Sequence, residues 1–355
     1  MATRSCPTTT SDSSFLAHRS LHIWKKIGEG SFSKVYLAKF GDTENESATL
    51  IATKVINKNR VSTKFVEKFL PRELDVMIKL RHPNIVQVYS VFQNGYKIYI
   101  NMEYAENGDM FTYLQKTKLT EVQIRSWLLQ ILWAFSYMHG LGVVHRDLKC
   151  ENILLTKRYN LRIADFGFAR FVNHGRNPGA DTVCGTMTYS APELLYGKRP
   201  YNPVATDVWA IGVVLFIMCN NVPPFRNSHK EDIHRKQMEK HFAFRRSLGR
   251  SRTLKDLTTT FLEPNFLKRT KIKTALQHPW IKEGNIKMPA DVAIANESIV
   301  VSISEPIVTE TSLRVPAFHY QLSEYEKSIS TDNELFTAEE EIEVIEEPKP
   351  LKQKK

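Results

Sequence analysis

The sequence predicts an α+β fold with two lobes, a small β-rich lobe up to about Met102 and a larger, mainly α-helical lobe after it. Short segments with alternating or β-branched residues, such as 51–56 and 97–102, lie in the first third of the chain and predict strands. The later apolar run 208–219 predicts a buried helix, because it is too short to span a bilayer. The 355 residues are enough for one large or two modest domains.

A glycine-rich segment lies near the start of the β-rich lobe. Gly28 and Gly30 follow the apolar pair 23–24 and precede the strand-like segment 35–38. Glycine lets backbone amides approach a phosphate closely, because no Cβ stands in the way. Ser33 occupies the position of a third glycine, so this loop is less permissive. A lone Gly-x-Gly is also typical of a simple hairpin turn, so the interpretation depends on residues elsewhere.

One of those residues is Lys54, which lies in the second strand-like segment. Its place after the glycine loop makes it the expected ligand of the α- and β-phosphates of a nucleotide. Residues 63–80 carry apolar side chains at helical spacing, and Glu73 within them is the expected partner of Lys54, with Glu67 as the alternative. Pro71 is disfavoured inside a helix, so we expect the helix to begin at or near it.

The most specific pattern is His-Arg-Asp-Leu-Lys-Cys-Glu-Asn at 145–152, followed by Asp-Phe-Gly at 165–167. Phosphoryl transfer from ATP requires an acceptor for the proton of the attacking hydroxyl, ligands for Mg²⁺, and positive charge near the γ-phosphate. Either motif alone would be weak evidence, but the ordered pair at this spacing is specific. The two motifs supply each of these groups: Asp147 could accept the proton, Asn152 and Asp165 could bind Mg²⁺, and Lys149 could provide the positive charge.

These motifs match the catalytic-loop and metal-binding signatures of eukaryotic protein kinases, and residues 23–281 resemble a serine/threonine protein kinase catalytic domain. Lys149 favours Ser/Thr over Tyr specificity. Segments 69–74, 147–152 and 184–186 resemble the testis-specific serine kinase family, within the calcium/calmodulin-dependent kinase group. The resemblance implies the bilobal kinase fold, ATP and Mg²⁺ as cofactors, phosphorylation of protein Ser/Thr, and a role in male germ-cell development or sperm formation.

The resemblance also implies a nucleotide site between the lobes. Strand 97–102 leads to a hinge at 103–105 whose backbone would bind the adenine edge, with Met102 as the gatekeeper. Asp109 falls near the ribose and the substrate's basic side chain, and an N-cap of the following helix is an equally good interpretation. The implied nucleotide-binding residues are Ile27, Gly28, Gly30, Ser33, Val35, Ala52, Lys54, Met102, Glu103, Ala105, Asp109 and Leu154.

An activation segment is expected from Gly167 to the Ala-Pro-Glu triplet at 191–193. Thr182 is the expected regulatory phosphothreonine, since a phosphate there would pair with arginines, and a plain exposed threonine is the alternative. The expected supporting residues are Arg146 and Arg170 for that phosphate, Thr186 bonded to Asp147 and Lys149, Asp207 bonded to catalytic-loop amides, and Glu193 paired with Arg269.

Charge is divided unevenly along the chain. Residues 284–355 hold 14 acidic and 7 basic residues, whereas the remainder carries a net charge of +18. We expect residues 1–22, rich in Ser and Thr, to be a disordered segment and residues 282–355 to be an acidic, disordered tail. A basic domain beside an acidic tail is compatible with intramolecular contact, nucleic-acid binding or solubility alone, and no motif supports nucleic-acid binding.

The four cysteines show no metal-ligand spacing, and the first 20 residues have no apolar core like that of a signal peptide. Both observations favour a reducing, cytoplasmic compartment. The expected partners are proteins phosphorylated on Ser/Thr, with a basic residue N-terminal to the site suggested by Asp109, and an upstream activating kinase. Neither nucleic acid nor a membrane is expected as a partner.

Two rival functions remain at this point. A pseudokinase scaffold usually lacks one of the residues equivalent to Lys54, Asp147, Asn152 and Asp165, and all four are present here. A small-molecule kinase could share the fold, but the complete activation segment and Asp207 favour protein substrates.

Overall fold

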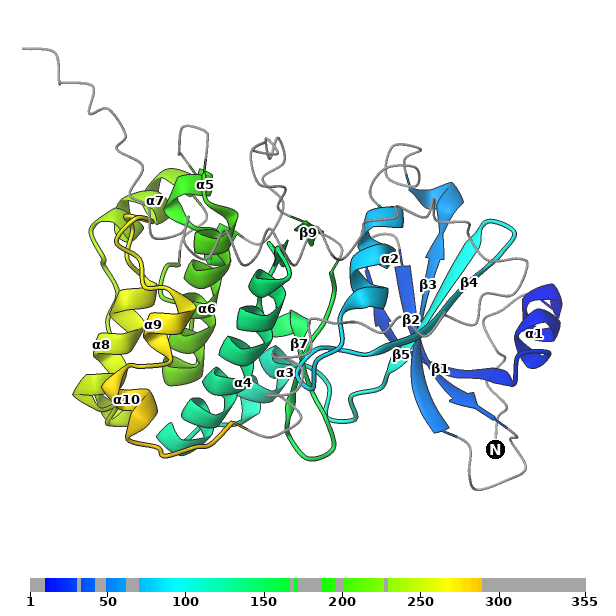
Figure 1. The fold of residues 1–355 in the computed structure, drawn as a ribbon, viewed down its shortest axis with the longest axis horizontal. Coiled ribbons are helices and arrows are strands. Elements are labelled where there is room, and N and C mark those ends of the chain that lie inside the picture. The colour runs from blue at the N-terminus through cyan, green and yellow to red at the C-terminus, as the bar shows by residue number, and fades with distance from the viewer. Residues whose placement is uncertain are drawn as a thin grey trace, which may run out of the picture. The chain divides into compact units, whose positions relative to one another are not determined.

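Five antiparallel strands in the order β1-β2-β3-β5-β4 form the sheet of the first lobe in the computed structural model (Figure 1). The structure describes residues 10–30, 33–41, 49–61, 70–166, 169–171, 187–195, 201–226 and 229–288, without the side chains of residues 10–13, 71–73, 75, 170 and 171. All of them belong to one compact unit, residues 1–313. The predicted bilobal α+β fold is confirmed, since helices dominate after β5.

The elements of the first lobe are α1 (Thr10–Ala17), β1 (Leu21–Glu29), β2 (Ser33–Phe40), β3 (Thr49–Asn57), η1 (Lys58–Arg60), α2 (Leu70–Lys79), β4 (Val88–Asn94) and β5 (Lys97–Glu103). The second lobe contains α3 (Met110–Lys116), α4 (Glu121–Gly140), β6 (Val143–Val144), η3 (Cys150–Asn152), β7 (Ile153–Leu155), β8 (Leu161–Ile163), β9 (Arg170–Phe171), η4 (Met187–Tyr189), α5 (Pro192–Leu195), α6 (Pro203–Asn220), α7 (Lys230–Met238), η5 (Arg246–Leu248), α8 (Arg252–Phe261), α9 (Ile272–Ala275) and α10 (Pro279–Lys282).

The register of the sheet decides which side chains share a face. Val35 pairs with Lys54, and Ala52 pairs with Met102. Directly opposed residues of antiparallel strands point to the same side, and alternate residues of one strand share that side. Val35, Ala52, Lys54 and Met102 therefore lie on one face of the sheet, the face that also packs with α2 in the larger hydrophobic core.

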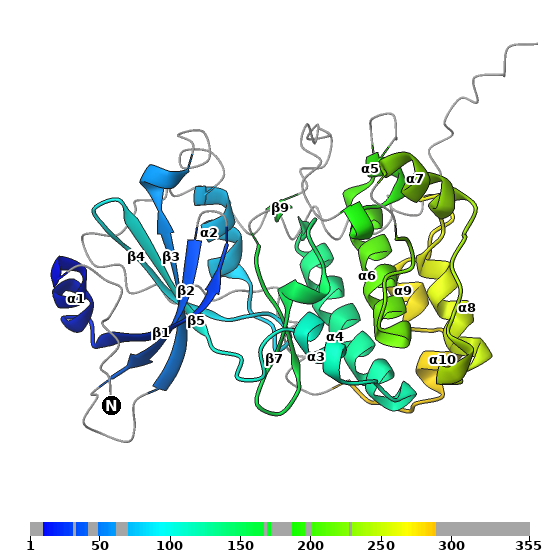
Figure 2. The same ribbon diagram turned by 180° about the vertical axis from the view of Figure 1, so that it is seen from behind.

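The other face of the sheet is covered by α1, which lies beside the sheet and away from α2 in both Figure 1 and Figure 2. Leu16 is 2% exposed and joins Phe92 and Tyr99 of the sheet in a second, smaller core. The Phe15 ring lies 5.6 Å from that of Phe92, and the Arg19 guanidinium lies 4.0 Å from the Phe15 ring centroid. This helix belongs to the domain that it covers.

The expectation that residues 1–22 are disordered is wrong for Thr10–Ala17, which form a helix. The segment has a serine-rich, weakly apolar sequence, so helical periodicity does not reveal it. Two side chains, Phe15 and Leu16, supply the apolar contact, and tertiary packing stabilises most helices in proteins more than intrinsic propensity does.

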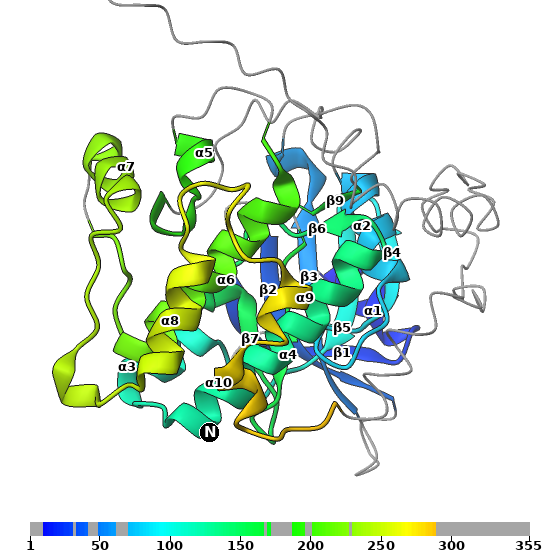
Figure 3. The same cartoon turned by 60° about the vertical axis from the view of Figure 1, so that its left-hand side comes forward.

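The second lobe is built around α4 and α6, which pack against each other and against α8 and α9 (Figure 3). Helix α4 begins with a capping box of Thr120 and Gln123, and α6 begins with Asn202 as the N-cap and Pro203 in its first turn. Among the described residues, α6 is the one helix long and apolar enough to cross a membrane, yet 83% of it is buried inside the protein. It is a core helix, as predicted.

Candidate active site

The predicted catalytic loop joins β6 to the short helix η3, and its side chains converge. Lys149 Nζ lies 2.8 Å from Asp147 Oδ2, and the side chain of Asp147 is 6% exposed. Asn152 Nδ2 donates to the Asp147 carbonyl oxygen at 2.9 Å and to Asp147 Oδ2 at 3.2 Å. Three of the four side chains predicted for the chemistry thus form one hydrogen-bonded group, which fixes the orientation of the Asp147 carboxylate.

Asp207, in the first turns of α6, holds this loop from behind. Its buried carboxylate accepts from the backbone N–H of His145 at 3.0 Å and of Arg146 at 2.8 Å, as predicted. It also accepts from His139 Nε2 at 2.9 Å. Arg146 has a φ of +69°, a left-handed conformation that a residue with a Cβ adopts at a cost of about 1–3 kcal/mol. The hydrogen bonds to Asp207 stabilise that conformation directly in front of Asp147.

The two predicted metal ligands lie at one end of a small hairpin. Strands β7 and β8 pair antiparallel, and Asn152 precedes β7 while Asp165 follows β8. The Ala164 N–H donates to the Asn152 carbonyl oxygen at 2.9 Å, which holds the two segments together. Asp165 has a φ of +60°, which aspartate tolerates better than most residues, and its side chain is 47% exposed.

This donor set fits Mg²⁺. The Asn152 amide nitrogen is turned toward Asp147, so its oxygen is left for another group, and Asp165 contributes a carboxylate. The described residues contain no cluster of three or more His, Cys, Asp or Glu side chains that could enclose a metal. Mg²⁺ prefers oxygen ligands and is commonly held by one or two protein groups together with substrate phosphates, so two ligands are enough.

Lys54 connects the sheet to this end of the hairpin. Its Nζ lies 3.0 Å from Asp165 Oδ1. The ammonium group holds the pKa of the Asp165 carboxyl below its ordinary value, and this attraction outweighs the opposing effect of burial. Asp165 is therefore anionic in neutral solution. The predicted partner Glu73 lies in α2, but its side chain is outside the described residues, as is all of the alternative Glu67. Helix α2 begins at Leu70, close to the expected start at Pro71.

Of the nucleotide-binding residues predicted in the first lobe, Val35, Ala52 and Met102 share the face that carries Lys54, and Gly28, Gly30 and Ser33 lie where β1 turns into β2. Gly30 N–H donates to the Ser33 carbonyl oxygen at 2.8 Å and closes the turn between β1 and β2. Ile27 falls at an irregularity in the β1–β2 register, between Lys26 and Gly28, and is 41% exposed. An extra residue at such a bulge is turned out of the regular alternation, which leaves this side chain in solvent.

The hinge adjoins the same face. The Ala105 N–H donates to no group in the described parts of the chain, so it is available to an adenine edge. Leu154 of β7 is bridged to Asp109 and packs against the main core. Asp109 caps α3 by accepting from Thr112 N at 2.8 Å and from Thr112 Oγ1 at 2.9 Å, which confirms the N-cap interpretation. Its expected contact with the ribose stays a prediction.

An ion pair at the hinge was not predicted. Arg162 Nε of β8 lies 2.7 Å and 2.8 Å from the two carboxylate oxygens of Glu103, at the end of β5. The polar residue in the apolar triplet Leu161-Arg162-Ile163 is the one sequence signal that could have drawn attention to it. Its partner could not be inferred, because the contact of β8 with β5 arises only from the tertiary structure. His145 is a second omission: its ring packs 5.1 Å from that of Phe166.

The activation segment lies largely outside the described residues. This applies to Thr182, to Thr186 and to the side chain of Arg170, so their predicted roles stay predictions. At the end of the segment, Arg269 Nη1 and Nη2 lie 2.7 Å and 2.9 Å from the two oxygens of Glu193, which confirms that predicted pair.

Two of the four cysteines lie in described regions, and both are buried. Burial raises the pKa of the Cys150 thiol to about 12, and it does the same for Cys219. A thiol with so high a pKa forms almost no thiolate at neutral pH. Cys150 therefore packs beside the catalytic loop as an inert residue.

Comparison with known proteins agrees with this geometry. The protein kinase domain family matches residues 21–281. The chain belongs to the protein kinase family. Among its relatives, mouse testis-specific serine/threonine-protein kinase 3 is 39% identical over 271 residues, which cover 75% of this chain and 98% of that protein. Human testis-specific serine/threonine-protein kinase 1 is 36% identical over 304 residues, or 84% and 81% of the two chains.

A rice kinase, CBL-interacting protein kinase 5, is 34% identical over 263 residues, or 74% of this chain and 56% of that protein. The resemblance to testis-specific serine/threonine kinases is thereby confirmed, and the chain is a serine/threonine protein kinase that uses ATP and Mg²⁺. Its domain limits at 23–281, with a tail from 282, stay predictions.

Proposed function

We propose that this kinase transfers the γ-phosphoryl group of ATP to protein Ser/Thr hydroxyls with Asp147 as the proton acceptor. The observation that carries the proposal is the hydrogen-bonded group of Asp147, Lys149 and Asn152, next to the pair of Lys54 and Asp165. Asp147 orients the substrate hydroxyl and accepts its proton as the oxygen bonds to phosphorus and ADP departs. Lys149 offsets negative charge on the transferring group.

The other residues of the site bind the nucleotide and position it for the transfer. Lys54 contacts the α- and β-phosphates, and Glu73 is its proposed second anionic partner. The loop from Gly28 to Ser33 covers the phosphates, and the hinge at 103–105 holds adenine. When bound to Asn152 and Asp165, Mg²⁺ neutralises charge on the phosphate oxygens. Holding the reacting groups in place can contribute roughly 7–11 kcal/mol toward the barrier, so small displacements at this site have large effects on rate.

Several finer proposals rest on the relatives and on the sequence. The testis-specific names of the similar proteins support a role in male germ-cell development or sperm formation. We also propose a cytoplasmic location, activation through phosphate at Thr182 by an upstream kinase, and a basic substrate residue recognised by Asp109. Neither nucleic acid nor a membrane is a proposed partner.

The experiment compares nucleotide binding and turnover in two variants of the full chain. Asp147→Ala should bind Mg²⁺-ATP as the wild type does but lose about 10²–10⁴-fold in kcat, the usual range for a proton-transfer group. Asp165→Ala should lose both turnover and the Mg²⁺ dependence of binding. If Asp147→Ala keeps a wild-type rate, the assignment of the base is wrong. If the wild type binds ATP without turnover after addition of an activating kinase, the chain is a pseudokinase scaffold.

A further inference from the structure

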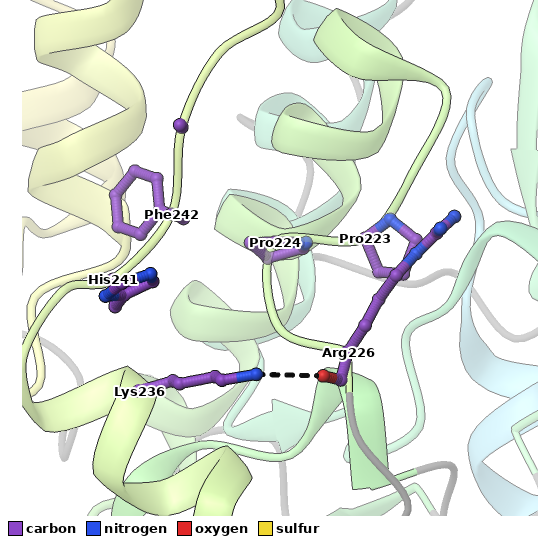
Figure 4. Close-up of a pocket in the computed structure, with 7 residues that line it drawn as sticks. Pro223, Pro224, Arg226, Lys236, His241 and Phe242 are labelled. Carbon is purple, nitrogen blue, oxygen red and sulfur yellow. Dashed lines mark hydrogen bonds between the residues drawn. The ribbon is translucent and has the colours of Figure 1, made fainter.

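A pocket of about 500 Å³ lies on the surface of the helical lobe, apart from the nucleotide-binding residues. It is formed by the segment after α6, by α7 and by the segment after α7. In Figure 4 the Lys236 side chain extends from α7 toward Arg226, and His241 and Phe242 lie opposite Pro223 and Pro224. The pocket thus combines a charged side with an apolar side.

The charged side of the pocket is cationic. Lys236 Nζ donates to the backbone carbonyl of Arg226 at 3.3 Å. In the described parts of the chain, no carboxylate pairs with the side chains of Arg226, Lys236 or His241. By contrast, the adjacent Arg235 of α7 lies 3.4 Å from both Asp232 and Glu239. In Figure 4 the Arg226 side chain extends past Pro223, away from Lys236, so the two cations lie at separate positions on the edge of the pocket. Cations without an acidic partner attract anions, and two separate cations suit a segment that carries several acidic side chains.

The apolar side is rigid. The Phe242 ring meets that of Phe225 edge-on, at 5.8 Å between centroids, and Phe225 stacks on Trp209 of α6 at 5.8 Å. Phe225 is fully buried. Because the wall rests on the core of the lobe, the pocket exists before any ligand arrives, and binding would require little reorganisation.

The pocket is connected to the segment that precedes α5. Gln237 of α7 donates from Nε2 to the Ser190 carbonyl oxygen at 2.9 Å. On the aromatic side, the Arg269 guanidinium lies 5.0 Å from the Trp209 ring centroid and pairs with Glu193. Residues next to the pocket thus link it to the end of the activation segment: Gln237 follows Lys236 in α7, and Trp209 packs beneath Phe225.

We propose that this pocket docks an acid-rich segment of the protein substrate, separate from the Ser/Thr that is phosphorylated. Glu or Asp side chains of that segment bind Arg226 and Lys236 through charge-assisted hydrogen bonds, and a neighbouring aliphatic side chain packs on Pro224 and Phe242. The inference rests on the proposed kinase function and adds a second determinant of substrate choice. Because the cations lie at the surface, docking should weaken as salt rises.

Docking is tested first without turnover, by fluorescence anisotropy with the full-length protein. The probe is a fluorescein-labelled peptide of alternating glutamates and leucines, and the comparison peptide has glutamine in place of glutamate. The glutamine peptide should bind at least tenfold more weakly. Arg226→Glu/Lys236→Glu should lose binding by at least tenfold, and Lys236→Gln by less. Arg235→Gln is the matched control, since it removes a cation of α7 outside the pocket. Equal loss in the control would overturn the proposal.

The second test measures phosphorylation of two peptides that share one phosphoacceptor sequence, one of which has a glutamate-rich extension. The extension should lower KM at least fivefold in the wild type and in Arg235→Gln. The double variant should lose this advantage with kcat unchanged. If the glutamate-rich extension still lowers KM in the double variant, the extension does not dock in this pocket and the proposal is wrong. Peptide binding without any transfer would instead contradict the kinase function and leave docking intact, so the two failures are distinguishable.

Discussion

Glu193 and Arg269 form a buried ion pair with two parallel hydrogen bonds, at 2.7 Å and 2.9 Å. Their side chains are 8% and 1% exposed. Arg269 also donates to the backbone carbonyl oxygens of Ala205, Glu263 and Pro264. One guanidinium thus joins the end of the activation segment to α6 and to the segment before α9.

Loss of one partner leaves the other charge buried. We expect Glu193→Ala to lower the free energy of unfolding by about 3–5 kcal/mol, as for other broken buried pairs. Glu193→Gln removes the charge but keeps one oxygen acceptor at the same place, so it should cost less. Urea denaturation of both variants measures the difference, and a loss below about 1 kcal/mol in Glu193→Ala would show that the pair contributes little to stability.

Removal of the Asp207 carboxylate should lower the rate of phosphoryl transfer rather than the affinity for the nucleotide. Asp207→Ala leaves the amides of His145 and Arg146 without their acceptor, so the strained loop in front of Asp147 should relax. A displacement of about 1 Å can cost about 10²-fold in rate, and we expect kcat to fall by that order with KM for ATP unchanged. Thr206→Val, the neighbouring position in α6, is the control for general destabilisation. A comparable fall in kcat in the control would contradict this assignment.

Because Lys54 and Asp165 form an ion pair, we expect Mg²⁺-dependent nucleotide binding to depend on pH. Lys54 lowers the pKa of Asp165 below its ordinary value of 3.8, so the carboxylate stays charged as the pH falls to that value. Lys54→Met removes the attraction and raises that pKa. The acidic limit of Mg²⁺-dependent nucleotide binding should therefore move to higher pH, as measured with a fluorescent nucleotide. Lys39→Met, elsewhere in the sheet, should leave the limit in place, and an unchanged limit in Lys54→Met would contradict the prediction.

A substitution that weakens the contact of α1 with the sheet should lower the stability of the protein without lowering its catalytic rate. Leu16 is 2% exposed in the core between α1 and the sheet, on the face opposite Lys54. Leu16→Ala should lower the free energy of unfolding by about 2–5 kcal/mol and leave kcat at low temperature unchanged. Leu267→Ala is a matched control, because Leu267 is 71% exposed, and it should change stability by less than about 0.5 kcal/mol. Equal stability of the two variants would mean that α1 does not dock.

The site residues could be predicted where local sequence determines the chemistry. The catalytic loop and the Asp-Phe-Gly motif carry Asp147, Asn152 and Asp165 at fixed spacing, and the structure brings them together through the β7–β8 hairpin. The alternation of β3 likewise implies that Ala52 and Lys54 share a face. Two long-range pairs, Asp207 with the loop amides and Glu193 with Arg269, followed from the resemblance to kinases and not from periodicity.

Other features could not be predicted, because no pattern in the neighbouring sequence indicates them. Helix α1 consists mostly of small polar residues, and its docking depends on Phe92 and Tyr99, more than 70 residues away in the chain. The pair of Arg162 with Glu103 and the pocket beside Phe242 arise from contacts between segments that are distant in sequence. Composition and periodicity describe single segments, so such contacts require the tertiary structure.

The role of Asp147 in Ser/Thr phosphorylation is tested by transfer of labelled γ-phosphate from Mg²⁺-ATP to a protein substrate, followed by phosphoamino-acid analysis. Wild type and Asp147→Asn would be purified identically and treated with the same upstream kinase. We expect label on Ser or Thr with the wild type, and a rate lower by a factor of at least about 10² with Asp147→Asn. Equal rates for the two proteins, or label confined to tyrosine, would contradict this expectation.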